Sequence, residues 1–453
     1  MVLFDKPISD NSSFISPEKW QQHFTQLLGP NVTPSPSDSD MSSYVTENSE
    51  KFKTELDNPI TRAEIIEEIS KLKNNKAVCF DRITNEILKA GKLVIAKPLL
   101  NLFNSILSST LYPSDWKIDI LTPLHKSGDK SEPNNYRGLA VSSCLGKLFN
   151  KILQRRLDKF CNKNSLISDL QGSGRVGSRT CDHLLILRCL FDKYVKHSNK
   201  YLYTCFVDLR KAFDTVSRVK LFYTLVNDYS IGGNFLKILQ QIYTGNKIHI
   251  KLSEGLVKPF STTVGVKQGC VFSPILFNLF INKICSVFDQ SCDPPELNNE
   301  NINCLLWADD LLLISKTPGG LQKSIDKMHQ FYQNLGFLEV NVKKTKIMIF
   351  NKRGLKMGDK CVFTLNNVPL EIADEYQYLG VKLRPSGSFS LAIQELNDKA
   401  SRAWFGISNI ILKNKRMQFS HFLTHLSHLS PHMEAQCGSH IVFPRNVLKQ
   451  KQK

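Results

Sequence analysis

The chain has 453 residues, with 59 Lys or Arg against 41 Asp or Glu, so its formal net charge is +18 at pH 7. This balance favours a polyanionic partner such as nucleic acid over an acidic small molecule, with a basic surface that has no such partner as the alternative. The sequence shows no signal-peptide pattern, no apolar run near membrane-spanning length and no C-x-x-C pair among its 12 cysteines, which argues against a secreted, membrane-spanning or zinc-ribbon protein and favours a soluble intracellular one, nuclear or cytoplasmic.

The N-terminal part, residues 1–60, predicts one helix followed by a flexible linker. Ser16 stands at an N-cap position, a proline follows it, and apolar residues then recur at helical spacing. The segment Asn31–Lys51 is rich in Ser, Pro and Asp, a composition typical of a linker. At Thr61 and Glu64 a capping box then opens an amphipathic helix.

Basic residues follow the next predicted strand. Ile118–Leu124 has the pattern of a strand, and Lys126 and Arg137 come after it in H-K-S-G-D-K and N-N-Y-R-G-L-A-V. Arg offers a planar fork to phosphate oxygens and Lys a mobile point charge, although each alone is more often a solvated surface cation. The helix pattern Leu145–Leu157 also carries basic residues outside its apolar face, as either a template-binding helix or a solvated one would.

A glycine-rich, basic stretch comes next. Gln171–Asp182 reads Q-G-S-G-R-V-G-S-R-T-C-D and precedes a helix pattern over His183–Val195. A loop of this kind at a helix start can bind phosphate, but the G-K-[ST] ending of a P-loop is absent.

Two strand patterns deliver acidic residues. The β-rich run Tyr201–Val207 ends in Asp208, and Asn303–Ser315 predicts a hairpin whose turn carries Asp309 and Asp310 between apolar strands. Carboxylates beside apolar strands lose water and repel each other, so a cation such as Mg²⁺ would stabilise them; a solvated Asp-Asp turn is the alternative. If the two strands lie side by side, the three carboxylates have the geometry of a two-metal phosphoryl-transfer site.

A third signal lies between these acidic stretches. Gly265–Pro274 reads G-V-K-Q-G-C-V-F-S-P and leads into an apolar helix pattern over Ile275–Val287. Its glycines allow the backbone to approach a ligand closely, and Gln268 and Ser273 supply polar groups.

Together these stretches carry a family resemblance. F-V-D-L-R-K-A-F-D, G-V-K-Q-G-C-V-F-S-P-I-L-F-N-L-F and W-A-D-D-L-L-L-I-S occur in this order and resemble three palm motifs of reverse transcriptases from non-LTR (LINE-type) retrotransposons. The resemblance covers roughly Thr61 to Arg416 and implies an α+β right-hand polymerase. No endonuclease domain is recognised ahead of the motifs, so we expect a fragment. The implied parts are fingers over 61–200, a palm with an antiparallel sheet over 201–384, a short thumb helix over 385–416 and a degenerate basic tail over 417–453.

The resemblance also implies an activity, RNA-directed DNA synthesis, with an RNA template, a DNA primer, deoxynucleoside triphosphates and two Mg²⁺ ions. The resemblance makes Asp208, Asp309, Asp310 and the backbone carbonyl of Leu209 the metal ligands. It makes Lys344 the residue that protonates the leaving pyrophosphate. One alternative is a catalytically silent remnant that binds RNA or RNA–DNA hybrids. Another, an intron-maturase-like RNA partner, is disfavoured because the motifs look LINE-like.

Further roles come from the same resemblance. The incoming nucleotide would be bound through its triphosphate by Lys126 and Arg137, through its sugar by Phe213, which excludes a 2′-hydroxyl, and from beneath by Gln268 and Gly269. Nucleic-acid contacts are implied for Arg175 and Arg179 at the template and for the hairpin with Tyr378 and Gly380 at the primer.

Three positions depart from the family pattern. Cys79 stands where a glycine is usual two positions before Asp81, Gly138 stands where a proline is usual, and Trp307 replaces a tyrosine. A cysteine would be strained if that turn needs a positive φ, and the larger Trp ring would shift the primer end. These departures favour a decayed copy, whereas the intact aspartates favour an active enzyme.

Overall fold

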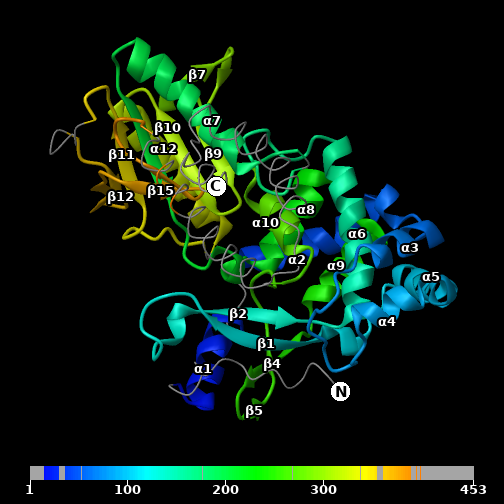
Figure 1. Ribbon diagram of the computed structural model, residues 1–453. Coiled ribbons are helices and arrows are strands. Elements are labelled where there is room, and N and C mark those ends of the chain that lie inside the picture. The colour runs from blue at the N-terminus through cyan, green and yellow to red at the C-terminus, as the bar shows by residue number, and fades with distance from the viewer. Residues whose placement is uncertain are drawn as a thin grey trace, which may run out of the picture.

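The computed structural model of the chain describes residues 15–29, 36–52, 54–175, 177–267, 269–336, 338–354, 361–388, 394 and 398. Helices and strands are mixed, as expected for an α+β protein, and two separate five-stranded sheets organise the strands (Figure 1). The expected basic tail and nearly all of the expected thumb helix lie outside these residues. None of the helices in the described ranges combines the length and apolarity that a membrane crossing requires.

The N-terminal helix forms as expected, but the linker after it does not. In α1 (Pro17–Leu28) the Ser16 hydroxyl accepts the N–H of Lys19. Most of the described part of the expected linker forms a helix, α2 (Pro36–Asn48). The prediction of a flexible linker was therefore wrong. Proline is compatible with a helix start, and Tyr44 packs on the ring of Tyr223 at 5.2 Å, a tertiary contact that average composition does not reveal.

Helices form the flank next to the first sheet. The capping box predicted at Thr61 and Glu64 is present at the start of α3. Arg155 and Arg156, predicted to lie on a template-facing or solvated surface, instead pair with glutamates of α3, as in the 2.7 Å contact between Arg156 and Glu64. The helices of this flank are α3 (Arg62–Ser70), α4 (Asn85–Ala90), α5 (Lys92–Ser109), α6 (Cys144–Lys163) and α9 (Gly233–Tyr243).

The first sheet joins two parts of the chain that are far apart in sequence. Its central strand β1 pairs antiparallel with β2 and parallel with β4, and β4 also pairs with β5 and β6. Helix α1 packs beneath this sheet (Figure 1), where Trp20 lies edge-on to the ring of Tyr136 at 4.8 Å. The strands are β1 (Ile118–His125), β2 (Tyr136–Val141), β4 (Lys247–Leu252), β5 (Gly255–Leu256) and β6 (Phe260–Ser261).

The second sheet has the order β14-β11-β3-β10-β9, and β3 runs antiparallel to both of its neighbours. All residues of β3 are buried, because alternate side chains enter two different cores. One core contains residues of α8 (Arg218–Tyr229), α10 (Ser273–Ile281) and α12 (Pro318–Leu335), and the other contains residues of α7 (Thr180–Leu190). The strands are β3 (Leu202–Val207), β9 (Cys304–Trp307), β10 (Asp310–Ser315), β11 (Lys346–Phe350) and β14 (Glu371–Ile372).

Shorter elements complete the described chain. The helix expected over Ile275–Val287 is interrupted, because α10 ends at Ile281 and α11 begins at Ile284. Helix α7 continues into a π-helix, Phe191–His197. The small hairpins are β7 (Glu296–Leu297) with β8 (Glu300–Asn301), β12 (Thr364–Leu365) with β13 (Val368–Pro369), and β15 (Tyr376–Tyr378) with β16 (Val381–Leu383). The 3₁₀ turns are Ser49–Lys51, Glu55–Asp57, Ser114–Lys117, Pro133–Asn135, Ala212–Thr215 and Gln290–Cys292.

Candidate active site

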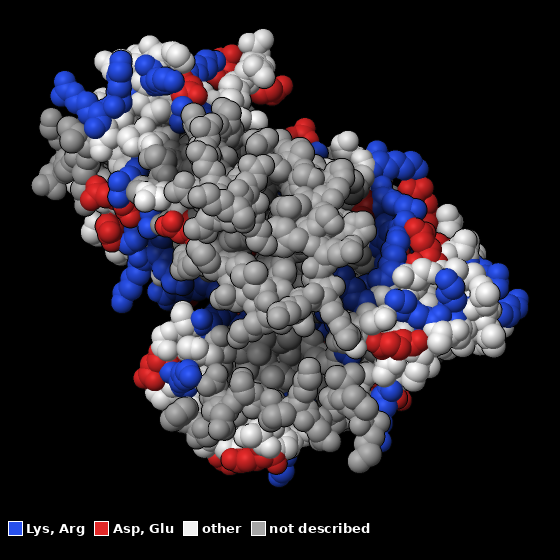
Figure 2. Space-filling view, in the orientation of Figure 1, with Lys and Arg blue, Asp and Glu red and all other residues white. Residues whose placement is uncertain are grey.

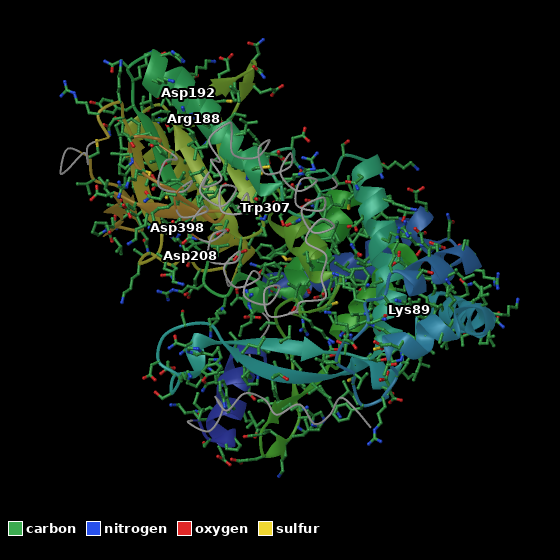
Figure 3. The ribbon with its side chains drawn as sticks, in the orientation of Figure 1. Lys89, Arg188, Asp192, Asp208, Trp307 and Asp398 are labelled. Carbon is green, nitrogen blue, oxygen red and sulfur yellow. The ribbon has the colours of Figure 1, made fainter. Side chains whose placement is uncertain are left out.

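Three carboxylates meet at one end of the second sheet. Strand β3 pairs with β10 so that Val207 lies opposite Leu311, which brings the next residue of β3, Asp208, beside Asp310. In the neighbouring hairpin Asp310 pairs with Trp307, and the turn between them carries Asp309. The predicted strand pairing is confirmed, and Figure 3 labels Asp208 and Trp307 in the part of the molecule that the second sheet forms.

The surroundings destabilise negative charge on the turn. Partial burial raises the pKa of Asp309 above its usual value, and the carboxylate of Asp208 raises it further. Loss of water raises the pKa of Asp310 to about 6, with smaller contributions from Asp309 and Asp208. Each carboxylate is therefore within electrostatic reach of the other two, and a cation placed among them would be favoured.

The donor set is suited to a hard divalent cation, although the side chains are not drawn together around one. Carboxylate and backbone carbonyl oxygens are the ligands that Mg²⁺ prefers. Within the described ranges, however, no group of three or more His, Cys, Asp and Glu side chains is close enough to hold an ion as it stands.

Backbone hydrogen bonds fix the end of β3 against the loop before β11. The N–H of Asp208 donates to the hydroxyl of Thr345 at 3.2 Å, and its carbonyl accepts the N–H of Asn341 at 2.7 Å. Leu209 forms an isolated antiparallel bridge with Val340. The same loop carries Lys344, the predicted general acid, which is exposed and directly precedes Thr345.

The two predicted triphosphate ligands are neighbours on the first sheet, and they face the aspartate turn. Arg137 pairs across the hairpin with Leu124, and Lys126 directly follows the end of β1 at His125. Burial lowers the pKa of Lys126, and the cations Arg137 and Lys344 lower it further, whereas Asp309 is among the acids that raise it. The structure thus brings together residues of the first sheet, the hairpin turn and the loop before β11.

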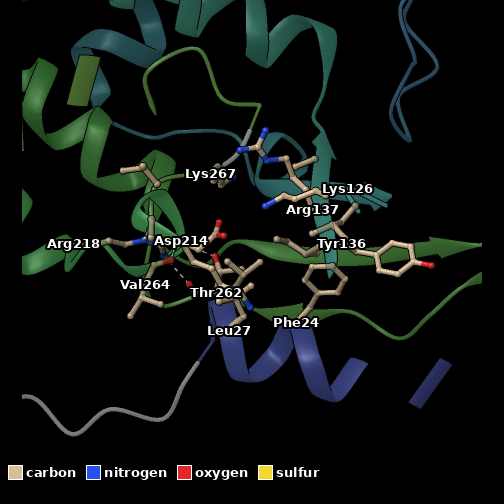
Figure 4. A pocket seen from close by; sticks show the side chains of 18 residues that line it. Phe24, Leu27, Lys126, Tyr136, Arg137, Asp214, Arg218, Thr262, Val264 and Lys267 are labelled. Carbon is tan, nitrogen blue, oxygen red and sulfur yellow. Dashed lines mark hydrogen bonds between the residues drawn. The ribbon is translucent and has the colours of Figure 1, made fainter. Parts of the chain in front are cut away.

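A small pocket opens beside these cations. Its floor includes Phe24 and Leu27 of α1, and Lys126, Arg137 and Asp214 point into it (Figure 4). Its lining therefore joins an apolar floor to a mostly basic rim. Figure 2 shows Lys and Arg side chains gathered between the two sheets on this face of the molecule.

The glycine-rich loop before α10 touches both neighbouring segments. Gly269 has φ +100°, and a β-carbon there would lie 2.8 Å from the carbonyl oxygen of Ala140. Gly265 has φ +78°, and a β-carbon there would lie 2.6 Å from the carbonyl oxygen of Asp214. Only glycine fits at both places. The hydroxyl of Ser273 donates to the carbonyl of Lys267 at 2.6 Å, so it stabilises the loop itself; Gln268 lies outside the described residues.

Arg218 holds the segment that leads into this loop, a role that the sequence did not suggest. Its side chain is half-buried, and the loss of water around the guanidinium lowers its pKa to about 10. Four of its hydrogen bonds go to backbone carbonyls and one to a hydroxyl, and no motif names such partners. The acceptors are the carbonyls of Tyr243, Thr262, Val264 and Gly265 and the hydroxyl of Thr262.

Phe213, the predicted sugar-selecting residue, is partly packed into the core. Its ring stacks on Phe277 of α10, with the ring centroids 4.5 Å apart and the planes 19° from parallel. The ring is half-buried, so part of its surface stays accessible. This stacking fixes the ring in the segment that immediately follows the Asp208 strand.

The predicted nucleic-acid contacts differ in accessibility. Arg179 is exposed, whereas the guanidinium of Arg175 pairs with Asp169 at 2.6 Å. The ring of Tyr378 is buried with its hydroxyl 3.4 Å from Nδ1 of His183, so the primer contact predicted for this hairpin falls to its exposed atoms. The strand's alternation turns that ring into the core, and Gly380 is exposed in the turn of the same hairpin.

The three departures from the family pattern are accommodated. Cys79 is buried and does not have a positive φ, so the backbone strain considered for this position does not arise. At Gly138 a β-carbon would lie 3.0 Å from the ring of Phe24, so the glycine makes room for α1. The Trp307 ring lies edge-on to His183 at 5.5 Å and is packed over Gly172, where a β-carbon would come within 2.7 Å of it.

Comparison with known proteins places the chain in a family. The family model described as reverse transcriptase (RNA-dependent DNA polymerase) matches residues 124–383, more than half of the chain. The Pol polyprotein of the type-2 retrotransposable element R2DM from Drosophila melanogaster is 26% identical over 313 residues, which cover 66% of this chain and 28% of that protein. The RNA-directed DNA polymerase from the mobile element jockey of the same organism is 24% identical over 349 residues, or 74% of this chain and 36% of that protein.

The chain therefore spans only about a third of the length of these curated relatives. Among solved structures, an apo telomerase from Candida Tropicalis truncated from its C-terminal domain is similar at 12% identity, with a TM-score of 0.44 over 82% of this chain and 94% of that one. The family match includes all three aspartates and both basic residues of the first sheet. The chain belongs to the reverse transcriptase family, with the right-hand polymerase fold that its motifs predicted and with non-LTR retrotransposon enzymes as its relatives.

Proposed function

We propose that this protein is an RNA-directed DNA polymerase of retrotransposon origin, which extends the 3′-hydroxyl of a DNA primer along an RNA template. The observation that carries this proposal is the meeting of Asp208, Asp309 and Asp310 opposite Lys126 and Arg137. In this assignment the first sheet and its flanking helices belong to the fingers over 61–200, although β4 to β6 come from later in the chain. The second sheet belongs to the palm over 201–384.

Asp208, Asp309, Asp310 and the carbonyl of Leu209 would hold two Mg²⁺ ions. When bound, these ions activate the primer hydroxyl and neutralise charge on the leaving pyrophosphate. The protein supplies the rigid frame, because the Asp208 backbone is held on both sides and the aspartate turn closes a buried hairpin. Such preorganisation lowers the cost of gathering negative groups at the moment of reaction.

The remaining roles concern the substrate. Lys126 and Arg137 bind the triphosphate of the incoming deoxynucleotide, and Phe213 lies beneath its sugar and excludes a 2′-hydroxyl. Gln268 and Gly269 lie under the nucleotide, and Lys126 and Arg137, which line one pocket, lie beside it. Lys344 donates a proton to the departing pyrophosphate.

Nucleic acid is bound outside this centre. Arg179 at the exposed start of α7 contacts the template, and Arg175 does so after exchanging its partner Asp169 for a phosphate. The turn of the β15–β16 hairpin at Gly380 contacts the primer. The alternative function is a silent remnant that binds RNA or RNA–DNA hybrids. The close packing of Gly138 on Phe24 and of Trp307 on Gly172 favours the active enzyme.

The test is incorporation of labelled dTTP on poly(rA)/oligo(dT) with Mg²⁺ by the wild type and by D309N. The amide keeps the shape of the side chain and removes its charge, so we expect incorporation to fall to background while hybrid binding in a gel-shift assay stays unchanged. D326N, the same change at an exposed aspartate of α12, is the matched control and should remain active. Full incorporation by D309N would refute the site, and hybrid binding without any incorporation by the wild type would select the remnant.

A further inference from the structure

We propose that Gln171 is a positioning residue that holds the aspartate turn in its productive backbone conformation. The proposal rests on the proposed function only for its consequence, the affinity of the turn for a divalent ion. Gln171 comes immediately before the glycine-rich basic loop, and its side chain reaches the residue that precedes Asp309.

The turn needs external support because of Ala308. This residue has φ +53°, in the left-handed region that L-residues with a β-carbon rarely adopt. A residue of this kind persists in such a conformation only when its surroundings fix it. The N–H of Ala308 donates to Oε1 of Gln171 at 3.1 Å, so a side chain from another segment fixes this peptide.

The Gln171 amide is itself held in one orientation. Its side chain is completely buried, and Oε1 also accepts the N–H of Ser173 at 3.1 Å. A flipped amide would place its NH₂ group against two N–H donors, so only the observed orientation is compatible with both bonds. Nε2 has no hydrogen-bond partner among the described residues. A buried donor without a partner is costly, which indicates that this glutamine serves the turn rather than general stability.

The backbone around Gln171 adds to the free edge of the second sheet. The N–H of Leu306 donates to the carbonyl of Leu170, and the N–H of Gly172 donates to the carbonyl of Leu306, both at 2.9 Å. The segment therefore lies parallel to β9, the outer strand that ends at Trp307. Any displacement of the basic loop that begins at Gly172 would be transmitted to the aspartate turn by these contacts.

Removing the acceptor should loosen the turn and weaken metal binding. Q171M keeps the length of the side chain but cannot accept the Ala308 N–H, and residues that orient metal ligands typically change metal affinity by about 10–100-fold. We therefore expect Mn²⁺ binding, measured by electron paramagnetic resonance, to be weaker in Q171M by at least about tenfold. Q171N, whose oxygen is too short to reach, serves if Q171M does not fold.

A double-mutant cycle identifies the mechanism. In A308G the turn residue adopts a positive φ without steric cost, so the loss of Mn²⁺ affinity caused by Q171M should be smaller in the A308G background than in the wild type. The matched control is Q322L. Gln322 also ties its amide to the backbone of another segment, at Thr364, and its loss should lower the melting temperature without changing Mn²⁺ affinity.

The outcomes separate this inference from the proposed function. Unchanged Mn²⁺ affinity in Q171M, or an equal loss in both backgrounds, overturns the role of Gln171 even if the wild type synthesises DNA. Weaker binding that A308G partly restores supports it, even if the wild type incorporates no nucleotide and the proposed activity fails. If the wild type binds no Mn²⁺, the melting temperatures of the four proteins of the cycle decide: coupling between the positions supports the role, and additivity overturns it.

Discussion

Replacing Arg218 with Met removes the half-buried cation that joins α8 to the segment before the glycine-rich loop. The guanidinium donates to four backbone carbonyls at 2.7–3.0 Å, three of them in Thr262–Gly265. The same segment is held from its other side by α1, because the carbonyl of Leu28 accepts the N–H of Thr263 at 2.9 Å. Arg218 thus fixes a loop that two glycines already force into close contact with its neighbours.

The size of the effect follows from two opposing contributions. Burial lowers the pKa of Arg218 to about 10, so keeping it charged there costs about 3 kcal/mol. Each carbonyl left without a donor in a buried position costs ~1–3 kcal/mol, and water entry or movement relieves part of that. With four carbonyls released, R218M should lose about 3–5 kcal/mol of unfolding free energy. R218K keeps a cation with fewer donors in the same place and should lose less.

Urea unfolding followed by circular dichroism measures this loss, and steady-state kinetics on poly(rA)/oligo(dT) measures its consequence. Because the segment leads to Gly269 beneath the predicted nucleotide, the KM for dTTP should rise in R218K, which is expected to stay folded. R62M is the control: Arg62 is exposed with one long bond, 3.5 Å, to the carbonyl of Leu93, and should change stability by less than about 0.5 kcal/mol. A loss below about 1 kcal/mol in R218M would refute the reasoning.

Three further predictions concern the nucleotide site and the helical flank. F213A should increase the incorporation of ribonucleotides relative to deoxynucleotides, and an unchanged sugar preference in competition assays would contradict the predicted gate. G269A should raise the KM for dTTP by about tenfold, because a β-carbon would clash with the Ala140 carbonyl and the φ of +100° disfavours alanine; an unaltered KM would count against close approach here. Burial raises the pKa of Asp158 to about 6, so the folded state favours its protonated form, and stability is lost as the pH rises from the unfolded value of about 4 through 6. D158N should therefore be more stable than the wild type at pH 8 and nearly equal to it at pH 4, whereas a difference independent of pH in urea unfolding would exclude this cause.

Local patterns predicted the parts of the fold that depend on nearby residues. The capping box at Thr61, the strand ending at Asp208 and the hairpin around Asp309 all have their main partners within a few positions or on an adjacent strand. The helix over Pro36–Asn48 was missed because its composition resembles a loop, and its stability comes from packing on α8. Such tertiary contacts override local propensity without leaving a local signal.

In the candidate site, too, residues that belong to a sequence motif were predicted and residues that act through tertiary contacts were not. Its acids and cations were predicted because their chemistry is tied to motifs in fixed order. Gln171 and Arg218 were not, because their partners are backbone N–H and carbonyl groups that every residue carries. The burial of the Tyr378 ring was missed for a related reason: a motif names the residue but not the face of the strand on which it lies.

The central claim is that three aspartates from two strands form one divalent-metal site. Fe²⁺ in place of Mg²⁺, with ascorbate and peroxide, cleaves the protein backbone next to the bound ion, and mass spectrometry locates the cuts. If the claim is correct, cuts fall near Asp208 and near the Asp309–Asp310 turn, excess Mg²⁺ suppresses them, and D309N loses them. Cuts confined to other regions, or cuts at these positions that persist in D309N, would contradict it.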